Sequence, residues 1–357
     1  MRQAALAFAS PAHPAALPPF ATRIAAWQER HGRHHLPWQC ADPYRIWLSE
    51  IMLQQTQVAT VLDYYPHFLA RFPDVAALAA AAEDDVLACW SGLGYYSRAR
   101  NLHHAARQVM DEHGGRFPAD RATLETLRGV GRSTAAAIAV FAYGHKEAIL
   151  DGNVKRILAR HTGIYGAPDR PATQQALWAT AEARLPDDAA TLRRYTQGLM
   201  DLGSALCTRS RPHCAACPVA ADCYALAHNA TATLPEKRRA KSKPEKTTVM
   251  LLARSGDNIH LYRRPDSGIW RSLWSLPEYD DTDAALHAAR RLGDIMAQRV
   301  LPAIRHSFTH YTLHITPLAV RIKNPVAPAD WLPRADALGK GLPAPVRRLI
   351  ETRAAAD

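Results

Sequence analysis

Residues 127–138 read Leu-Arg-Gly-Val-Gly-Arg-Ser-Thr-Ala-Ala-Ala-Ile and place two glycines in a turn directly before an alanine-rich, helix-forming segment. Such a turn lets backbone N–H groups at a helix N-terminus approach a phosphate, because Gly129 and Gly131 carry no Cβ. The stretch lacks the lysine pattern of a Walker phosphate loop. Two interpretations follow from it alone, a phosphate cradle and an ordinary tight connection between two helices.

Helical periodicity extends outward from this turn, from about Ala21 to Leu226. In residues 43–62 the apolar side chains recur at helical spacing, while Glu50, Gln54 and Gln57 lie at i, i+4 and i+7 on another face. This half of the chain is therefore predicted to be all-α. Glycine-containing breaks between helices are expected at Gly92, Gly94, Gly114, Gly115, Gly129, Gly131, Gly152 and from Gly163 to Pro168.

The block after the turn, residues 149–156, reads Ile-Leu-Asp-Gly-Asn-Val-Lys-Arg. It sets an acid, an amide and two bases around the start of the next helix. Asp151 fits a simple helix N-cap as well as a functional carboxylate. Together with the preceding turn, the block favours a functional site over a plain connection.

Four of the six cysteines, Cys207, Cys214, Cys217 and Cys223, lie close together, with six, two and five residues between them. Disulfides are disfavoured because the other two cysteines are isolated and nothing else suggests a disulfide-rich secreted chain. Zinc sites usually show paired Cys-x2-Cys motifs, whereas this chain has one. The spacing favours a 4Fe-4S cluster, with zinc as the alternative.

Length and composition indicate two domains with a basic surface. The 357 residues exceed one ordinary compact domain, and 48% of them are hydrophobic, which is enough to fill two cores. The formal charge of +11 suits a polyanion such as nucleic acid, although a basic enzyme from an arginine-rich proteome is the alternative. No apolar run approaches the roughly 20 residues of a membrane span, and prolines interrupt the N-terminal apolar stretch. We expect a soluble monomer in the reducing cytoplasm, associated with the nucleoid.

The second half of the chain changes its pattern. Residues 231–246, Thr-Ala-Thr-Leu-Pro-Glu-Lys-Arg-Arg-Ala-Lys-Ser-Lys-Pro-Glu-Lys, read as a linker because they are rich in Lys, Arg and Pro. Short β-rich runs at 247–254 and 259–264 follow, joined by Ser-Gly-Asp-Asn as a hairpin turn. A helix over 281–292, an alternating strand over 306–322 and a closing helix over 344–353 complete a predicted α+β domain.

These elements give a predicted division of the chain into four parts. They are a disordered tail (1–20), a helical catalytic domain (21–226), a basic linker (227–246) and the α+β domain (247–357).

In this order, the hairpin at 127–135, Asp151 and the cysteine array resemble the helix-hairpin-helix DNA glycosylases that carry a 4Fe-4S cluster. Three further stretches resemble the adenine DNA glycosylases of the MutY type within that superfamily. They are Trp47-Leu-Ser-Glu-Ile-Met-Leu-Gln-Gln-Thr-Gln57, Gly92-Leu-Gly-Tyr-Tyr-Ser-Arg98 and Leu150–Arg156. The resemblance covers residues 24–223 strongly. More weakly, the C-terminal half resembles the Nudix-like recognition domain of these enzymes.

The resemblance implies a division of chemical labour between two carboxylates. Cleaving the bond between adenine and its sugar requires protonation of a poor leaving group and stabilisation of an oxocarbenium-like sugar. Glu50 is the implied general acid toward adenine N7, and its apolar neighbours could desolvate it and favour its protonated form. Asp151 is expected to stay ionised and to stabilise the cationic sugar, either electrostatically or as a transient nucleophile, and Asn153 to orient the sugar or Asp151.

Ser133 distinguishes two branches of the superfamily. Relatives that resemble endonuclease III carry there a lysine that forms a Schiff base with the sugar, which a serine cannot do. Monofunctional hydrolysis is therefore implied. Some adenine glycosylases have a tyrosine at this position, so any help from that phenol is missing here or supplied otherwise.

Contacts with double-stranded DNA are also implied by the resemblance. Adenine must be flipped out of the duplex, and Gln55 and Tyr95 match positions that insert into it. The hairpin glycines Gly129 and Gly131, together with Ser133 and Lys155, are the implied DNA-contacting residues of the helical domain. Arg209 and Arg211 would place the cysteine loop against phosphates.

The C-terminal domain lacks the acidic Gx5Ex7REx2EE run of a Nudix hydrolase, so hydrolysis there is not expected. Its stretch Arg305-His-Ser-Phe-Thr-His310 resembles the loop that reads 8-oxoguanine, where relatives often have Phe-Ser-His. Phe308, Thr309 and His310 are the implied recognition residues, with Thr309 keeping the hydroxyl. Trp270 and Trp274 are expected to pack in the core.

The function implied is that of a monofunctional DNA glycosylase that excises adenine mispaired with 8-oxoguanine or guanine during base excision repair. Two alternatives stay open at this point. One is an endonuclease III-like glycosylase and lyase for oxidised pyrimidines, and the other is a non-catalytic iron–sulfur DNA-binding protein.

Overall fold

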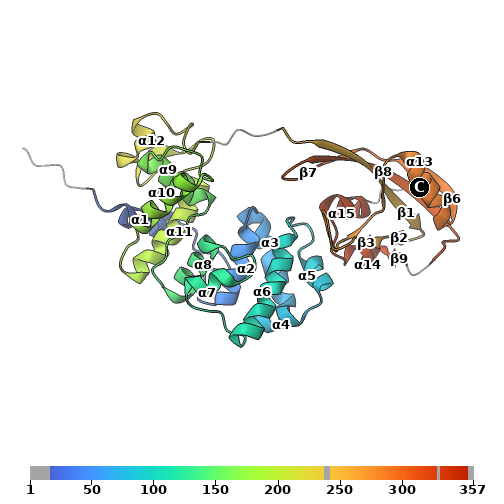
Figure 1. Ribbon diagram of the computed structural model, residues 1–357, viewed down its shortest axis with the longest axis horizontal. Helices are drawn as coiled ribbons and strands as arrows, with labels where there is room; N and C mark the ends of the chain where they lie inside the picture. The colour runs from blue at the N-terminus through green and yellow to red at the C-terminus, as the bar shows by residue number, and fades with distance from the viewer. Residues whose placement is uncertain (1–16, 237–241, 328–329, 353–357) are drawn as a thin grey trace, which may run out of the picture. The chain divides into compact units, whose positions relative to one another are not determined.

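The computed structural model describes residues 17–236, 242–327 and 330–352, and Figure 1 labels most of its helices and strands. The chain groups into two compact units. We call residues 1–34 and 144–237 the cysteine unit, and residues 35–143 and 238–357 the hairpin unit. Each unit is described by itself.

Three helices in the helical part of the hairpin unit, α2, α4 and α7, begin at aspartates that cap them. Asp42, Asp74 and Asp120 each accept a hydrogen bond from a backbone N–H in the first turn of the following helix. The helices of this part pack around fully buried Trp47 and Trp90. They are α2 (Pro43–Leu53), α3 (Val58–Arg71), α4 (Val75–Ala80), α5 (Glu83–Cys89), α6 (Ser97–His113), α7 (Arg121–Thr126), α8 (Arg132–Ile138) and the π-helical turn η1 (Ala139–Tyr143).

The expected helical face shared by Glu50, Gln54 and Gln57 is wrong. Helix α2 ends at Leu53 and α3 begins at Val58, so Gln54 is the C-cap of one helix and Gln57 the N-cap of the next. The break has a backbone cause, because Gln55 adopts a left-handed conformation with φ of 58° that no helix continues. The break lifts Gln55 into an exposed turn.

The C-terminal part of the hairpin unit is an α+β domain, as predicted. Its main sheet has the strand order β6-β8-β1-β2-β9, in which the long strands β1 and β8 run parallel and the other neighbours are antiparallel. The elements are β1 (Glu245–Ser255), β2 (Asn258–His260), β3 (Tyr262–Arg263), β4 (Trp274–Ser275), β5 (Glu278–Tyr279), α13 (Thr282–Leu292), β6 (Asp294–Val300), β7 (Ile304–Ser307), β8 (Thr312–Lys323), β9 (Trp331–Pro333), α14 (Arg334–Leu338) and α15 (Ala344–Glu351).

Two local predictions in this domain are confirmed and one is wrong. Strands β1 and β2 form the expected hairpin, with Ser255 paired to Asn258, and α13 begins at the N-cap Asp281. The single strand expected over 306–322 is instead two antiparallel strands, β7 and β8, in which Ile304 pairs with Ile315 and Ser307 with Thr312. The turn between them contains Phe308, Thr309 and His310, which alternation alone could not distinguish from strand residues.

The cysteine unit contains the remaining helices. A close approach of α1 and α11 requires Gly198, since a Cβ there would lie 2.6 Å from the Ile24 side chain. Asp151 is the N-cap of α9, and Asp188 is the N-cap of α11. The elements are α1 (Phe20–His31), α9 (Gly152–Thr162), α10 (Pro171–Glu182), α11 (Ala189–Ala205), the 3-10 turns η2 (Cys214–Ala216) and η3 (Ala220–Asp222), and α12 (Tyr224–Ala227).

The predicted tail and linker lie partly outside the described residues. Of the tail, residues 17–19 are described, and they lead directly into α1. Of the linker, residues 227–236 and 242–246 are described. Leu234 is 1% exposed and packs with Ala225 and Ala230, so the first part of the linker belongs to the cysteine unit. Within the described chain, no helix combines the length and apolar character needed to cross a membrane.

Candidate functional site

The glycine turn predicted at 127–131 connects α7 and α8, as a helical hairpin. Gly129 has φ of 81°, and a Cβ at this position would lie 2.8 Å from the Cβ of Asn101. Both the backbone conformation and the close approach therefore require glycine. Gly131 is the exposed N-cap of α8, and Ser133 follows in the partly buried first turn. The turn thus presents backbone at a helix start, with Val130 buried beneath it.

Glu50 lies in the last turn of α2 and is partly buried. Its neighbours Trp47, Leu48 and Met52 are fully buried, so the helix that carries Glu50 is firmly packed into the core. The packed helix excludes water from one side of Glu50, while the residue itself stays partly exposed. Such partial exclusion of water is what a group that transfers protons requires.

Arg98 connects the end of α2 with a second loop of the hairpin unit. Its Nη1 donates to the carbonyl oxygens of Ile51, Met52 and Gln54, at 3.0, 2.7 and 2.6 Å. Its Nη2 donates to Thr56 Oγ1 at 3.0 Å and to the carbonyl oxygens of Leu93 and Gly94, at 3.3 and 3.1 Å. The side chain is buried, and desolvation lowers the pKa of Arg98 to about 10, so it remains charged at neutral pH.

The two predicted duplex-inserting residues lie in the loops that Arg98 holds. Gln55 and Tyr95 both adopt left-handed backbone conformations, with φ of 58° and 49°, and both are exposed. Tyr95 is 48% exposed, and the Arg98 guanidinium carbon lies 5.6 Å from its ring centroid. Arg98 therefore joins the end of the helix that bears Glu50 to the loops that bear Gln55 and Tyr95.

Asp151 lies in the cysteine unit as the N-cap of α9, where Oδ1 accepts a hydrogen bond of 2.8 Å from the N–H of Val154. Burial raises the pKa of Asp151, while the N–H groups of Val154 and Asn153 and the charge of Arg156 act in the opposite direction. The N-cap and functional interpretations of Asp151 are thus compatible. The same carboxyl group caps the helix and is held out of water.

Asn153 is fixed by its surroundings. Its Oδ1 accepts a hydrogen bond of 2.8 Å from Arg156, which also donates to the carbonyl oxygens of Gly203 and Cys207. A Cβ on Gly203 would lie 2.5 Å from the Cβ of Asn153, so α11 approaches α9 closely at this point. Lys155 follows on α9 and is partly exposed.

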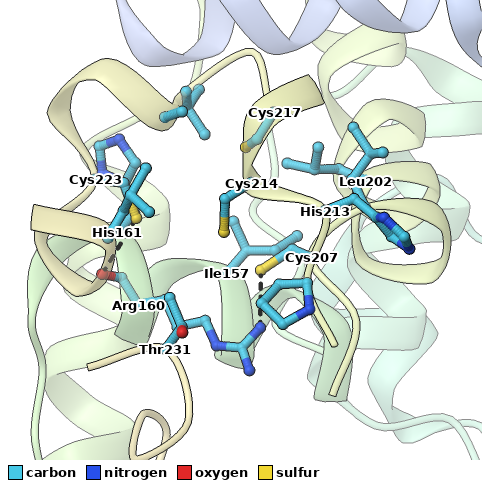
Figure 2. Close-up of a pocket in the computed structure, with 15 residues that line it drawn as sticks. Ile157, Arg160, His161, Leu202, Cys207, His213, Cys214, Cys217, Cys223 and Thr231 are labelled. Carbon is cyan, nitrogen blue, oxygen red and sulfur yellow. Dashed lines mark hydrogen bonds between the residues drawn. The ribbon is translucent and has the colours of Figure 1, made fainter. Parts of the chain in front are cut away.

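The four clustered cysteines line one pocket, and Figure 2 shows their side chains around a common space. Arg160 closes one side, where Nη1 lies 3.4 Å from Cys207 Sγ, and its other bonds reach the carbonyl oxygens of Thr208 and Leu234. Burial, followed by repulsion from the neighbouring thiols, raises the pKa of Cys217 to about 11. Burial also raises the pKa of Cys214, so a cation in the pocket would favour the thiolate forms of Cys214 and Cys217.

The cysteine loop is anchored next to its last cysteine, Cys223. Asp222 pairs with Arg23 at 2.6 Å and with His161 at 3.1 Å, and the Arg23 hydrogen bond is the main reason that the pKa of Asp222 falls to about 2. No cysteine of the described residues forms a disulfide. Within these residues, no three His, Cys, Asp or Glu side chains converge closely enough to hold a single metal ion.

The predicted recognition residues lie in the turn between β7 and β8, which we call the reader turn (residues 308–311). Phe308 begins this turn, with ring centroids of Trp270, His306 and Tyr311 at 5.1, 4.6 and 4.7 Å. Thr309 and His310 are exposed at its tip, and Lys243 donates to the carbonyl oxygen of Phe308. Trp270 is buried, as expected for core packing, and the surface that it packs against is this turn.

Sequence reasoning missed Arg98, although a signal was present. Arg98 occupies the buried face of α6 together with Leu102, Ala105 and Val109. A charged residue at a position whose helical periodicity is apolar is a sign of a buried, fully bonded group.

Comparisons with known proteins agree with this architecture. Residues 48–183 match the family model described as HhH-GPD superfamily base excision DNA repair protein, and residues 248–352 match a NUDIX domain model. The adenine DNA glycosylase of Buchnera aphidicola subsp. Schizaphis graminum is 32% identical over 341 residues, which cover 93% of this chain and 98% of the relative. The human adenine DNA glycosylase is 33% identical over 384 residues, which cover 88% of this chain and 70% of the human protein.

Solved structures share the helical fold. A thermostable thymine-DNA glycosylase matches with a TM-score of 0.53 and 29% identity, covering 58% of this chain and 95% of that chain. A non-covalent endonuclease III–DNA complex matches with a TM-score of 0.50 and 20% identity, covering 58% and 94%, a likeness that extends to the fold alone.

Proposed function

Because the chain belongs to the adenine DNA glycosylase family, we propose that it removes adenine mispaired with 8-oxoguanine or guanine from double-stranded DNA. The family makes the chain a DNA glycosylase of base excision repair, and the choice of mispair is the proposal. The observation that carries it is the Arg98 network, which joins the helix end bearing Glu50 to the loops bearing Gln55 and Tyr95. A proton donor and two exposed wedge residues on one rigid frame suit chemistry on an extruded base. We further propose that the protein acts as a monomer and, because its substrate is DNA, in association with the nucleoid.

In the proposed reaction, the Glu50 carboxyl group gives its proton to adenine N7. The bond between C1′ and N9 then breaks, adenine leaves with the bonding electrons, and C1′ becomes cationic. Water attacks C1′ and passes its proton to the Glu50 carboxylate, which restores the acid and leaves an abasic site. Asp151, held at the start of α9, stabilises the cationic sugar, and Asn153 orients it.

Ser133 accounts for hydrolysis without strand cleavage. A lyase needs an amine at this place to form a Schiff base with C1′, and a hydroxyl group forms none. The chain is accordingly a monofunctional glycosylase. The partly buried position of Ser133 in the first turn of α8 suits a contact with the DNA backbone instead of covalent chemistry.

The DNA contacts are proposed from the exposed features of each unit. In the hairpin unit, the turn at Gly129 and Gly131 offers backbone N–H groups to phosphates. In the cysteine unit, Lys155 adds a cation at the start of α9. Gln55 and Tyr95 enter the stack and hold the duplex open while adenine is flipped.

The reader turn is proposed to recognise the base opposite adenine. Phe308 is packed on three aromatic rings and so presents a fixed stacking face. Thr309 and His310 lie exposed beside it and supply hydrogen-bonding groups. Both features suit an oxidised guanine.

A 4Fe-4S cluster is proposed for the cysteine pocket, held by Cys207, Cys214, Cys217 and Cys223. The four thiols line one space, and burial raises the pKa of Cys214 and Cys217, so a cationic partner would favour their thiolate forms. When bound, the cluster would supply structural cross-linking of the loop. Arg160 and Asp222 already fix that loop at both ends, and exposed Arg209 and Arg211 would then face phosphates.

The test is single-turnover base release from four duplexes, carrying adenine opposite 8-oxoguanine, guanine or thymine, or carrying thymine glycol. Wild type should release adenine opposite 8-oxoguanine and guanine, without strand cleavage, and Glu50→Gln should lose at least about 100-fold in rate. Cleavage at thymine glycol, or adenine release that survives Glu50→Gln, would contradict the proposal.

A further inference from the structure

The loop that carries Tyr95 is held by the C-terminal domain as well as by Arg98. Ser91, at its start, is 5% exposed, and its hydroxyl group donates to the carbonyl oxygen of Leu342 at 3.0 Å. The Ser91 hydroxyl oxygen also accepts hydrogen bonds from the N–H of Leu342 at 3.2 Å and from Arg347 Nε at 3.0 Å. All three bonds that a hydroxyl group can make are therefore directed at residues 342–347.

Tyr96 holds the other end of this loop to the same residue. Its hydroxyl group donates to the carbonyl oxygen of Leu342 at 2.6 Å and accepts from the N–H of Gly92 at 3.2 Å. Both the Ser91 and the Tyr96 hydroxyl groups are buried, so their bonds are not exchanged with water. Residues 92–95 are thus bracketed by two side chains fixed to Leu342.

The backbones also approach closely at this contact. A Cβ on Gly341 would lie 2.9 Å from the Cβ of Leu87, and a Cβ on Gly92 would lie 2.2 Å from the Tyr64 hydroxyl group. The Tyr64 hydroxyl group in turn donates to the carbonyl oxygen of Ser91 at 2.9 Å. Contacts this tight transmit a displacement, because a packed interface has few intermediate arrangements.

The same interface continues to the reader turn. Arg100 of α6 donates to the carbonyl oxygen of Arg271 at 3.2 Å. The preceding residue, Trp270, has φ of 53°, and its ring centroid lies 5.1 Å from that of Phe308 and 5.4 Å from that of His306. Residues 91–100 therefore contact the C-terminal domain at two places, at Leu342 beside the Tyr95 loop and at Arg271 next to Trp270, which supports the reader turn.

We propose that Ser91, Tyr96 and Arg347 are positioning residues that couple recognition of the opposite base to insertion of Tyr95. Contact of the reader turn with 8-oxoguanine fixes the C-terminal domain, and the bonds from Leu342 and Arg347 then favour the inserted conformation of residues 92–95. The coupling acts on selectivity, because a guanine opposite adenine fixes the reader turn less well and gives less support to Tyr95. This inference rests on the proposed function.

The experiment compares single-turnover adenine release opposite 8-oxoguanine and opposite guanine in wild type, Ser91→Ala and Arg347→Met. The rate opposite 8-oxoguanine divided by the rate opposite guanine should fall by about tenfold in each variant. The double variant should fall no further than either single variant, since both remove one connection. The matched control is Arg334→Met, because Arg334 donates to the carbonyl oxygens of Ile350 and Glu351 within the C-terminal domain, and its ratio should stay at the wild-type value.

An unchanged ratio in Ser91→Ala and Arg347→Met, or an equal fall in the control, would overturn the inference. If the alanine variant does not fold, Arg347→Lys carries the same test, because it keeps the charge and removes the Nε donor. A wild type that releases no adenine from either duplex contradicts the proposed function instead, so the two failures are distinguishable.

Discussion

Replacing Arg98 by lysine tests the network on which the site is built. Nη1 of Arg98 serves the carbonyl oxygens at the end of α2, and Nη2 serves Thr56 and the carbonyl oxygens of Leu93 and Gly94. A lysine ammonium is one point with three N–H groups, so it serves one side and leaves the other without donors. Losing the three bonds of Nη2 at about 1 kcal/mol each gives roughly 3 kcal/mol of destabilisation.

The assay is thermal unfolding followed by tryptophan fluorescence, combined with single-turnover adenine release. A loss of roughly 3 kcal/mol lowers the Tm by about 6–12 °C, because each 1 kcal/mol shifts the Tm by about 2–4 °C in a body of this size. Release should slow at temperatures where the variant is fully folded, since Gln55 and Tyr95 lose their common support. The control is Arg107→Lys on the same helix, whose exposed side chain makes a bond of 3.3 Å to Ala79, with an expected effect below about 0.5 kcal/mol.

Two results would refute this reasoning. If Arg98→Lys unfolds at the temperature of the Arg107→Lys control, the hydrogen bonds of Arg98 do not stabilise the fold. If it unfolds earlier but releases adenine at the wild-type rate while folded, Arg98 stabilises the core without positioning the two loops.

Three further changes have expected outcomes. Asp151→Asn keeps the N-cap, and because burial raises the pKa of Asp151, the wild-type protein loses stability as the pH rises through that pKa. The variant should therefore have a higher Tm than wild type at pH 7, measured by thermal unfolding, and should release adenine at least about 100-fold more slowly. Cys217→Ser should lower iron content and the absorbance near about 400 nm expected of a 4Fe-4S cluster, whereas Cys40→Ser, at an exposed isolated cysteine, should leave both unchanged. Gly129→Ala should weaken binding to duplex DNA in a fluorescence anisotropy titration and cost about 1–2 kcal/mol, because φ of 81° and the neighbouring Asn101 both oppose a Cβ.

The features that the sequence predicted are those with local causes. The helical half, the α+β half, the β1–β2 hairpin and the helix predicted over 281–292 all follow from patterns within a few residues of the element concerned. The two wrong elements, a continuous helix over 43–62 and a continuous strand over 306–322, both contain a turn whose residues fit the surrounding pattern. In both cases the turn contains residues proposed to meet DNA.

The turn at Gln55 illustrates why such breaks escape a local interpretation. A left-handed conformation costs a residue with a Cβ about 1–2 kcal/mol, and both Gln55 and Tyr95 adopt it. The compensating bonds come from Arg98, more than 40 positions along the chain from the first loop. Since the loop of Gln55 does not contain its own stabilising partner, no window of sequence around Gln55 could predict its conformation. The strain and its support lie in different elements, and this arrangement keeps two bulky side chains exposed on a rigid frame, as insertion into a base stack requires.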